Sequence, residues 1–144
     1  MSMITCVLFV VSLAQQFYAG SASPVGVWKT FDDHTGKASS LVRITEEGNY
    51  VMARIERLLT PGDEKRLCGK CPGDRKDQPL VGLLFMRRMI LVNGEYQGGE
   101  ILDPESGATY RCKLKVSDDG RTMRVRGFLG VSLFGRSQTW ERQP

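Results

Sequence analysis

Two cysteines three positions apart, in the stretch "LCGKCPGD", are the residues of this chain best suited to chemistry. Cys68 and Cys71 could form a thiol redox pair, half of a zinc site or a short disulfide. A thioredoxin-like pair needs a helix start, which lowers the thiol pKa, whereas this pair lies in a loop that contains Gly and Pro. The basic neighbours Lys65, Arg66 and Lys70 would still favour thiolates, so the redox interpretation stays open.

A zinc site requires two further ligands, and after residue 22 the chain offers only Cys112 and His34 as matching types. The alternation of residues 109–116 turns Cys112 toward the core, where an unpaired thiol behaves as a small hydrophobe. His34 lies in an unrelated stretch, "DDHTGK". Two ligands do not make a site, so we predict no metal and no cofactor.

A hydrolase would need a base and a nucleophile. Asp32 and Asp33 beside His34 could orient that residue as a base, but no nucleophile is evident. Asp103 and Glu105 are paired carboxylates, yet they belong to "DPESG", which is first of all a turn. Motifs such as Gly-x-Ser-x-Gly and His-Glu-x-x-His are missing from the sequence. We therefore predict no catalytic residues and keep a hydrolase only as an alternative.

The first 22 residues contain no charged side chain, and residues 4–14 form a largely apolar stretch. This pattern is typical of a secretory signal peptide, and the run is about half of the roughly 20 apolar residues that a transmembrane helix needs. The small residues Gly20 and Ala22 place the cleavage after Ala22. We expect an exported protein, periplasmic or secreted; a buried N-terminal strand or helix is the alternative.

Residues 23–144 have the length of one domain, and no second apolar run in them could span a bilayer. The net charge of +4 falls well short of the charge expected of a nucleic-acid-binding domain. We expect neither nucleic acid nor stable membrane insertion, and the oligomeric state stays open. The arginines that we interpret as solvated strand residues are Arg87, Arg88, Arg121, Arg124 and Arg126.

The chain reads as short alternating strands separated by turn residues. Residues 109–116 are the clearest case, because alternate residues from Tyr110 to Val116 share one apolar face. They form a predicted hairpin with residues 121–128 across "SDDG". Residues 81–92 lack clean alternation and fit either a buried strand pair or a helical turn. Further strands are predicted at 25–31, 41–46, 50–58, 96–102 and 137–142.

Seven or eight short strands leave exposed edges, which closure of the sheet removes. We therefore predict an all-β fold, a single antiparallel up-and-down barrel of about eight strands with at most short helical turns. A barrel of this size is filled by its own side chains or holds one small ligand, here a hydrophobic or amphipathic one. The residues that alternation turns inward are Val42, Ile44, Val51, Ala53, Ile55, Ile101, Tyr110, Leu114, Met123 and Val125.

Export into an oxidising compartment favours the disulfide among the three interpretations of the cysteine pair. A Cys68–Cys71 bond closes a very short loop, so its entropic stabilisation should be at the low end of the roughly 2 to 4 kcal/mol typical of disulfides. We expect it mainly to stiffen the long polar connection of residues 60–78 at the barrel mouth.

Two stretches at opposite ends of the chain, "GVW" and "TWER", bear on barrel closure. Gly-x-Trp on the first strand, with a basic residue on the last, resembles the closure signature of lipocalin-like (calycin) barrels. The resemblance implies an arginine across the Trp28 ring, a cation–π contact worth about 0.5 to 2 kcal/mol, supplied by Arg142 or Arg136. The predicted closure residues are Gly26, Trp28, Arg136, Trp140 and Arg142.

Longer stretches resemble the secreted bacterial family known as domain of unknown function 2147: "GVWKT", "CGKCPGDRKDQPLVGL", "GGEILDPESGATYRCKLKV" and "RVRGFLGVSLFGRSQTWER". That resemblance implies an exported calycin-like barrel in which a ligand cavity can form, and it carries no established activity. The alternatives to a ligand-binding protein are an envelope interaction or stress-response protein without a small ligand, a hydrolase and a thiol-redox protein. In the first alternative, "RRMILVNG" would be an exposed partner site.

Overall fold

A computed structural model of the protein describes residues 22–131 and 135–144, and these residues form nine short strands. One turn of 3-10 helix, Gly73–Arg75, lies between the third and fourth strands. The predicted leader, residues 1–22, falls outside the described residues except for Ala22. The strands are β1 (Gly26–Phe31), β2 (Ala38–Glu47), β3 (Tyr50–Leu58), β4 (Leu84–Val92), β5 (Glu95–Gln97), β6 (Glu100–Leu102), β7 (Thr109–Val116), β8 (Thr122–Phe128) and β9 (Gly135–Arg142).

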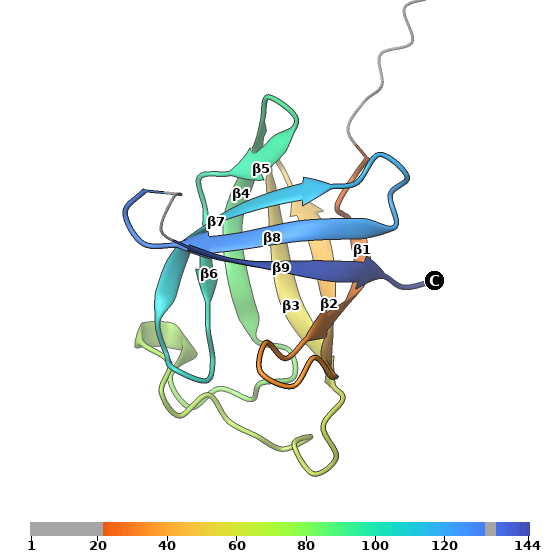
Figure 1. Ribbon diagram of the computed structural model, residues 1–144. Coiled ribbons are helices and arrows are strands. Elements are labelled where there is room, and N and C mark those ends of the chain that lie inside the picture. The colour runs from red at the N-terminus through yellow and green to blue at the C-terminus, as the bar shows by residue number, and fades with distance from the viewer. Residues whose placement is uncertain (1–21, 132–134) are drawn as a thin grey trace, which may run out of the picture.

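The strands form one antiparallel sheet that closes on itself (Figure 1). Consecutive strands pair with each other except β5 and β6, and β1 pairs with β9. Short β5 and β6 both lie between β4 and β7, so together they occupy one strand position of an eight-stranded barrel. The predicted all-β, lipocalin-like barrel with short helical turns is confirmed.

The predicted strand 96–102 is interrupted at two glycines. Gly98 has a φ of 83°, a left-handed conformation that favours glycine. A Cβ atom at Gly99 would overlap the carbonyl oxygen of Arg87 on the neighbouring strand. The close approach of the β4 backbone therefore divides this strand into β5 and β6.

Residues 81–92, which lack clean alternation, contain β4, a strand with two irregularities. Between the pairs Arg54–Leu84 and Ala53–Met86, β4 advances two residues while β3 advances one. The extra residue, Phe85, is buried beside Met86. A second register shift follows farther along the strand. Each β-bulge reverses the inward and outward alternation, which is why a period of two could not be found there.

Connections alternate between the two ends of an up-and-down barrel. The β1–β2, β3–β4 and β6–β7 connections meet at one end, along which the long β3–β4 connection runs (Figure 1). We call this the lidded end and residues 59–83 the lid. The start of β1, the end of β9 and the β7–β8 turn meet at the opposite end, here called the closed end (Figure 1). No helix in residues 22–131 or 135–144 is long and apolar enough to cross a membrane.

Candidate functional site

The closed end is fastened by Arg142 at the end of β9. Its Cζ lies 4.3 Å from the centre of the Trp28 ring, directly opposite on β1. The indole is fully buried, and its Nε1 donates a hydrogen bond to the Pro24 carbonyl at 2.7 Å. The guanidinium donates to three backbone carbonyls, those of Gly120 (2.6 Å), Val25 (2.9 Å) and Ser23 (2.6 Å). These contacts join β1, β9 and the β7–β8 turn.

Arg136, the other candidate for the Trp28 contact, lies elsewhere. Its Nε is 3.0 Å from Asp33 Oδ2 in the β1–β2 connection, at the lidded end. Because Trp28 is opposite Arg142 in the strand register, a residue near the start of β9 is too far along the strand to reach the indole. The second predicted tryptophan, Trp140, is buried and packs against Phe85 with ring centres 6.2 Å apart.

The barrel interior is filled where the sequence predicted cavity-lining residues. Ile44, Ala53, Leu114 and Met123 are 0% exposed. A side chain that lined an enclosed space large enough for water would keep some surface accessible to a water-sized sphere. These four side chains therefore pack against protein atoms on all sides. Of the other predicted residues, Ile101 and Tyr110 are half-buried, and the buried ones are Val42, Val51, Ile55 and Val125.

The lid contains the Cys-x-x-Cys pair. Cys68 and Cys71 form a disulfide, as predicted, and both are buried in the same core cluster as Leu80 and Leu83. The lid folds back on itself, since the Cys68 N–H donates to the Gln78 carbonyl at 2.8 Å. The disulfide thus anchors the lid to the core.

The lid is also tied to the β6–β7 turn. Arg66 contacts Glu105 at 2.6 Å and Asp63 at 3.0 Å, and these hydrogen bonds raise the pKa of the Arg66 guanidinium. In the turn, Asp103 accepts hydrogen bonds from the Glu105 N–H and the Ser106 hydroxyl. The Asp103 carboxylate therefore stabilises the turn, and the Glu105 carboxylate forms the ion pair with Arg66.

His34 is an exposed loop residue. Asp32 accepts hydrogen bonds from the backbone N–H groups of His34 and Thr35, which lower the pKa of its carboxyl. Cys112 is a free thiol in the core, where burial raises its pKa to about 12. Within the described ranges, no group of three or more His, Cys, Asp or Glu side chains is placed to hold a metal ion.

Three arginines surround a hollow of about 330 Å³ where the lid meets β3 and β4. Arg87 makes a two-point contact with the Asp74 carboxylate, at 2.6 and 3.3 Å, and this lowers the pKa of Asp74. Arg75 is 6% exposed and contacts Glu100 at 3.0 Å. Arg54 donates to a lid carbonyl at 3.2 Å. We call Arg54, Arg75 and Arg87 the arginine cluster.

The solvated interpretation of Arg87 was wrong. Its side chain is 26% exposed and is held against the lid, because two bulges re-aim the residues of β4. Neither Arg54 nor Arg75 was singled out from the sequence. The only signal for Arg75 was the density of charge in "GDRKDQPLVG", next to the Cys-x-x-Cys pair, and the sequence held no signal for Arg54.

Residues 26–142 match the protein family described as "Uncharacterized protein conserved in bacteria (DUF2147)". The chain belongs to this family.

The DUF2147 barrel is similar to a solved structure from the human pathogen Helicobacter pylori, protein HP1028, which is described as belonging to the lipocalin family. The two chains are 19% identical, with a TM-score of 0.76, and the match covers 86% of this chain and 85% of that one. At this identity the likeness shows a shared fold. A search of curated proteins found no match.

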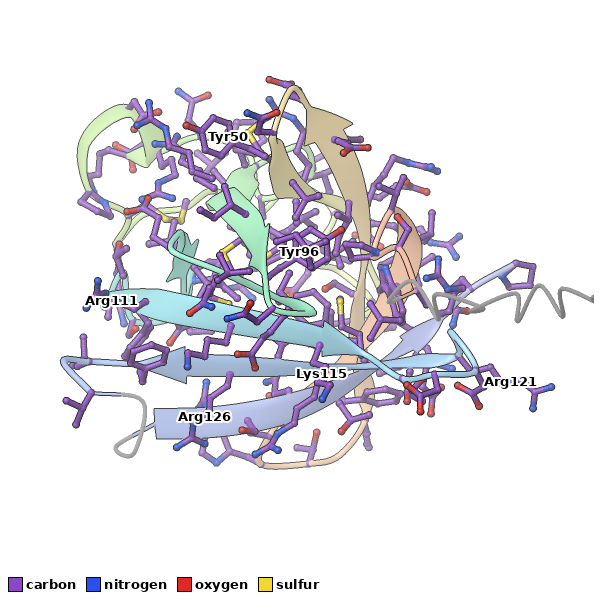
Figure 2. All side chains as sticks on the ribbon, turned by 90° about the horizontal axis from the view of Figure 1, so that it is seen from above. Tyr50, Tyr96, Arg111, Lys115, Arg121 and Arg126 are labelled. Atoms are coloured by element: carbon purple, nitrogen blue, oxygen red, sulfur yellow. A yellow bond between two sulfur atoms is a disulfide. The ribbon has the colours of Figure 1, made fainter. Side chains whose placement is uncertain are left out.

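The outer face of β7 and β8 in the DUF2147 barrel is basic (Figure 2). Lys113 lies opposite Arg126, and Lys115 lies opposite Arg124. Like charges directly across a strand pair are destabilising, so this face works against sheet stability. Lys113 is partly compensated by Glu95, at 3.8 Å.

Proposed function

We propose that this DUF2147 barrel binds a small hydrophobic or amphipathic molecule that enters at the lidded end. The observation behind this proposal is that the two ends of the barrel are closed in different ways. At the closed end, Arg142 joins strands and turn through backbone carbonyls and an aromatic ring. At the lidded end, a connection with one disulfide covers the opening. The interior of an eight-stranded barrel is either filled by side chains or holds one small ligand, and a ligand would enter here at the end without the Arg142 contacts.

The filled interior sets a condition on this function, because a guest must displace side chains. Met86, Met89 and Met123 are all fully buried in the core. Methionine is unbranched and fills irregular space, so it repacks around a guest at lower cost than branched residues. We expect the binding-competent state to have the lid lifted and these methionines rearranged.

Native mass spectrometry of protein purified from its own envelope tests the proposal. We expect a co-purifying lipid-like mass, and uptake of a fluorescent fatty acid by delipidated protein. Replacing all three core methionines with leucine keeps the volume but removes flexibility, and should weaken uptake. Protein with neither a co-purifying mass nor probe uptake would rule out the proposal.

Export is part of the same proposal. The Cys68–Cys71 disulfide supports it, since disulfides persist in oxidising compartments such as the periplasm. N-terminal sequencing of protein recovered from the envelope should begin at Ser23. Recovery of an intact N-terminus in the cytoplasm would contradict export.

A second candidate is partner binding without a small ligand. Ile90 and Leu91, in the "RRMILVNG" stretch of β4, expose 37% and 51% of their surface. Exposed apolar residues that lie together can mark partner sites. Sedimentation of the pure protein tests this directly: a dimer that Leu91→Glu dissociates would favour this candidate, and a monomer would leave the ligand proposal in place.

A further inference from the structure

The arginine cluster carries more positive charge than its neighbours balance. Three guanidiniums, from Arg54, Arg75 and Arg87, meet two carboxylates, those of Asp74 and Glu100. Arg54 reaches neither carboxylate and donates instead to a carbonyl of the lid. The hollow that these side chains line therefore has a net positive charge.

The buried donors of the cluster are incompletely paired. Arg75 Nη2 donates to Glu100, but Nε and Nη1 of Arg75 are buried with no acceptor among the described residues. Nε of Arg87 is in the same situation. A buried donor without an acceptor costs about 1 to 3 kcal/mol, more when the group is charged. Both arginines with these unpaired donors line the same hollow.

Asp74 is a replaceable partner for Arg87. Its side chain is 70% exposed, and it lies in the lid, whereas Arg87 is on the barrel wall. Its two oxygens meet the two terminal nitrogens of Arg87, the fork geometry in which arginine binds carboxylate and phosphate. A ligand oxyanion would take the same geometry once Asp74 turned toward solvent.

We propose that the arginine cluster binds an oxyanion, a carboxylate or a phosphate group, and that Asp74 occupies the Arg87 fork until this group displaces it. The oxyanion is either the head group of the amphipathic guest or a free ion. Leu83 lines the hollow and also belongs to the core cluster, so the hollow adjoins the barrel core. An apolar tail would enter the core there once the core side chains rearrange. The oxyanion site is independent of the proposed function, and only the placement of an apolar tail in the barrel rests on it.

The test uses three probes on the oxidised protein from residue 23 onward: dodecyl phosphate, dodecanol and inorganic phosphate. Calorimetry should give dodecyl phosphate at least a roughly tenfold advantage over dodecanol, as expected for charge-assisted hydrogen bonds. Arg87→Gln should remove this advantage, and Asp74→Asn should increase it by removing the competing carboxylate. Arg124→Gln, which replaces an exposed arginine on β8, is the matched control and should leave the affinity for both dodecyl probes unchanged.

A direct readout comes from the Nε–H signals of Arg75 and Arg87 in ¹⁵N NMR spectra. Both should shift when dodecyl phosphate binds and stay in place with dodecanol. A shift with inorganic phosphate alone would identify a free anion as sufficient, whereas a shift only with dodecyl phosphate would identify the head group of an amphiphile. Either result supports the oxyanion site.

The two proposals fail in different ways. Equal affinity for dodecanol and dodecyl phosphate, unchanged in Arg87→Gln, would overturn the oxyanion site and leave the barrel ligand standing. If the protein bound inorganic phosphate but neither dodecyl phosphate nor dodecanol, the barrel ligand would be overturned and the oxyanion site would stand. Because Asp74 is exposed, Asp74→Asn will fold, and weaker phosphate binding by this variant would also overturn the inference.

Discussion

Arg142 on the last strand covers the ring of Trp28 on the first, with its Cζ 4.3 Å from the ring centre. The two residues are opposite each other in the β1–β9 register, so the contact lies across the seam where the two ends of the chain meet. The Trp28 side chain touches neither solvent nor an internal cavity, since its exposed fraction is 0%. The ring of this cation–π contact is therefore desolvated, while the Arg142 side of the contact is only half-buried.

Arg142→Ala should destabilise the barrel by about 2 to 4 kcal/mol, because it removes a cation–π contact with a buried ring and three hydrogen bonds from a charged donor. Urea unfolding measures this change. Arg136→Ala on the same strand is the matched control, since its ion pair with Asp33 is largely exposed, and exposed pairs are worth about 1 kcal/mol or less. Equal losses for both variants would contradict the role of Arg142.

Gly26→Ala should also destabilise the closed end. Gly26 has a φ of 136°, and a Cβ there would lie 2.9 Å from Arg142 Nη1. Part of the loss is backbone strain, of order 1 to 3 kcal/mol, and part is the clash with the guanidinium. The double variant with Arg142→Ala should therefore lose less than the sum of the two single losses. Strict additivity in a urea-unfolding cycle would show that the clash is unimportant.

Replacing Cys68 and Cys71 with alanine should loosen the lid more than the barrel. The bond closes a short loop, so the global loss should be at the low end of about 2 to 4 kcal/mol. Hydrogen exchange should show faster exchange of lid amides, including the amide at position 68, which in the wild type donates to the Gln78 carbonyl. The amides of β8 should keep their protection. Cys112→Ala, which leaves the disulfide intact, should spare the lid, and uniform loss of protection would argue against a separate lid.

The buried thiol of Cys112 predicts a loss of stability in alkaline solution. In the unfolded chain this thiol ionises near pH 9.0, whereas burial raises its folded pKa to about 12. Above pH 9 the unfolded chain has lost a proton that the folded chain keeps, so stability falls as pH rises toward 12. Between pH 9 and 12, each pH unit should lower the unfolding free energy of the wild type by about 1.4 kcal/mol relative to that of Cys112→Ala. A stability difference between the two proteins that stays constant from pH 8 to 11 would contradict this.

Much of the barrel could be predicted because most strands alternate strictly. The β7–β8 hairpin is an example, where Leu114 and Met123 point inward as their spacing requires. Alternation failed in β4, because bulges around Phe85 break the period of two, and bulges have no reliable sequence signature. Alternation turned eight of the ten predicted residues into buried positions and left Ile101 and Tyr110 half-buried, yet strand parity could not show whether the interior holds a cavity.

The sequence by itself determined the all-β class, because alternation and turn residues are local patterns. The resemblance of "GVW" and "TWER" to lipocalin-like barrels implied the closure, and expected export favoured the disulfide among three interpretations of the cysteine pair. Only the tertiary structure decided which arginine meets Trp28, since Arg136 and Arg142 differ solely in where the β9 register places them. It also decided that Arg54, Arg75 and Arg87 share one hollow. Their encounter depends on the path of the lid and the bulges of β4, and a long-range meeting of this kind leaves no trace in residue spacing.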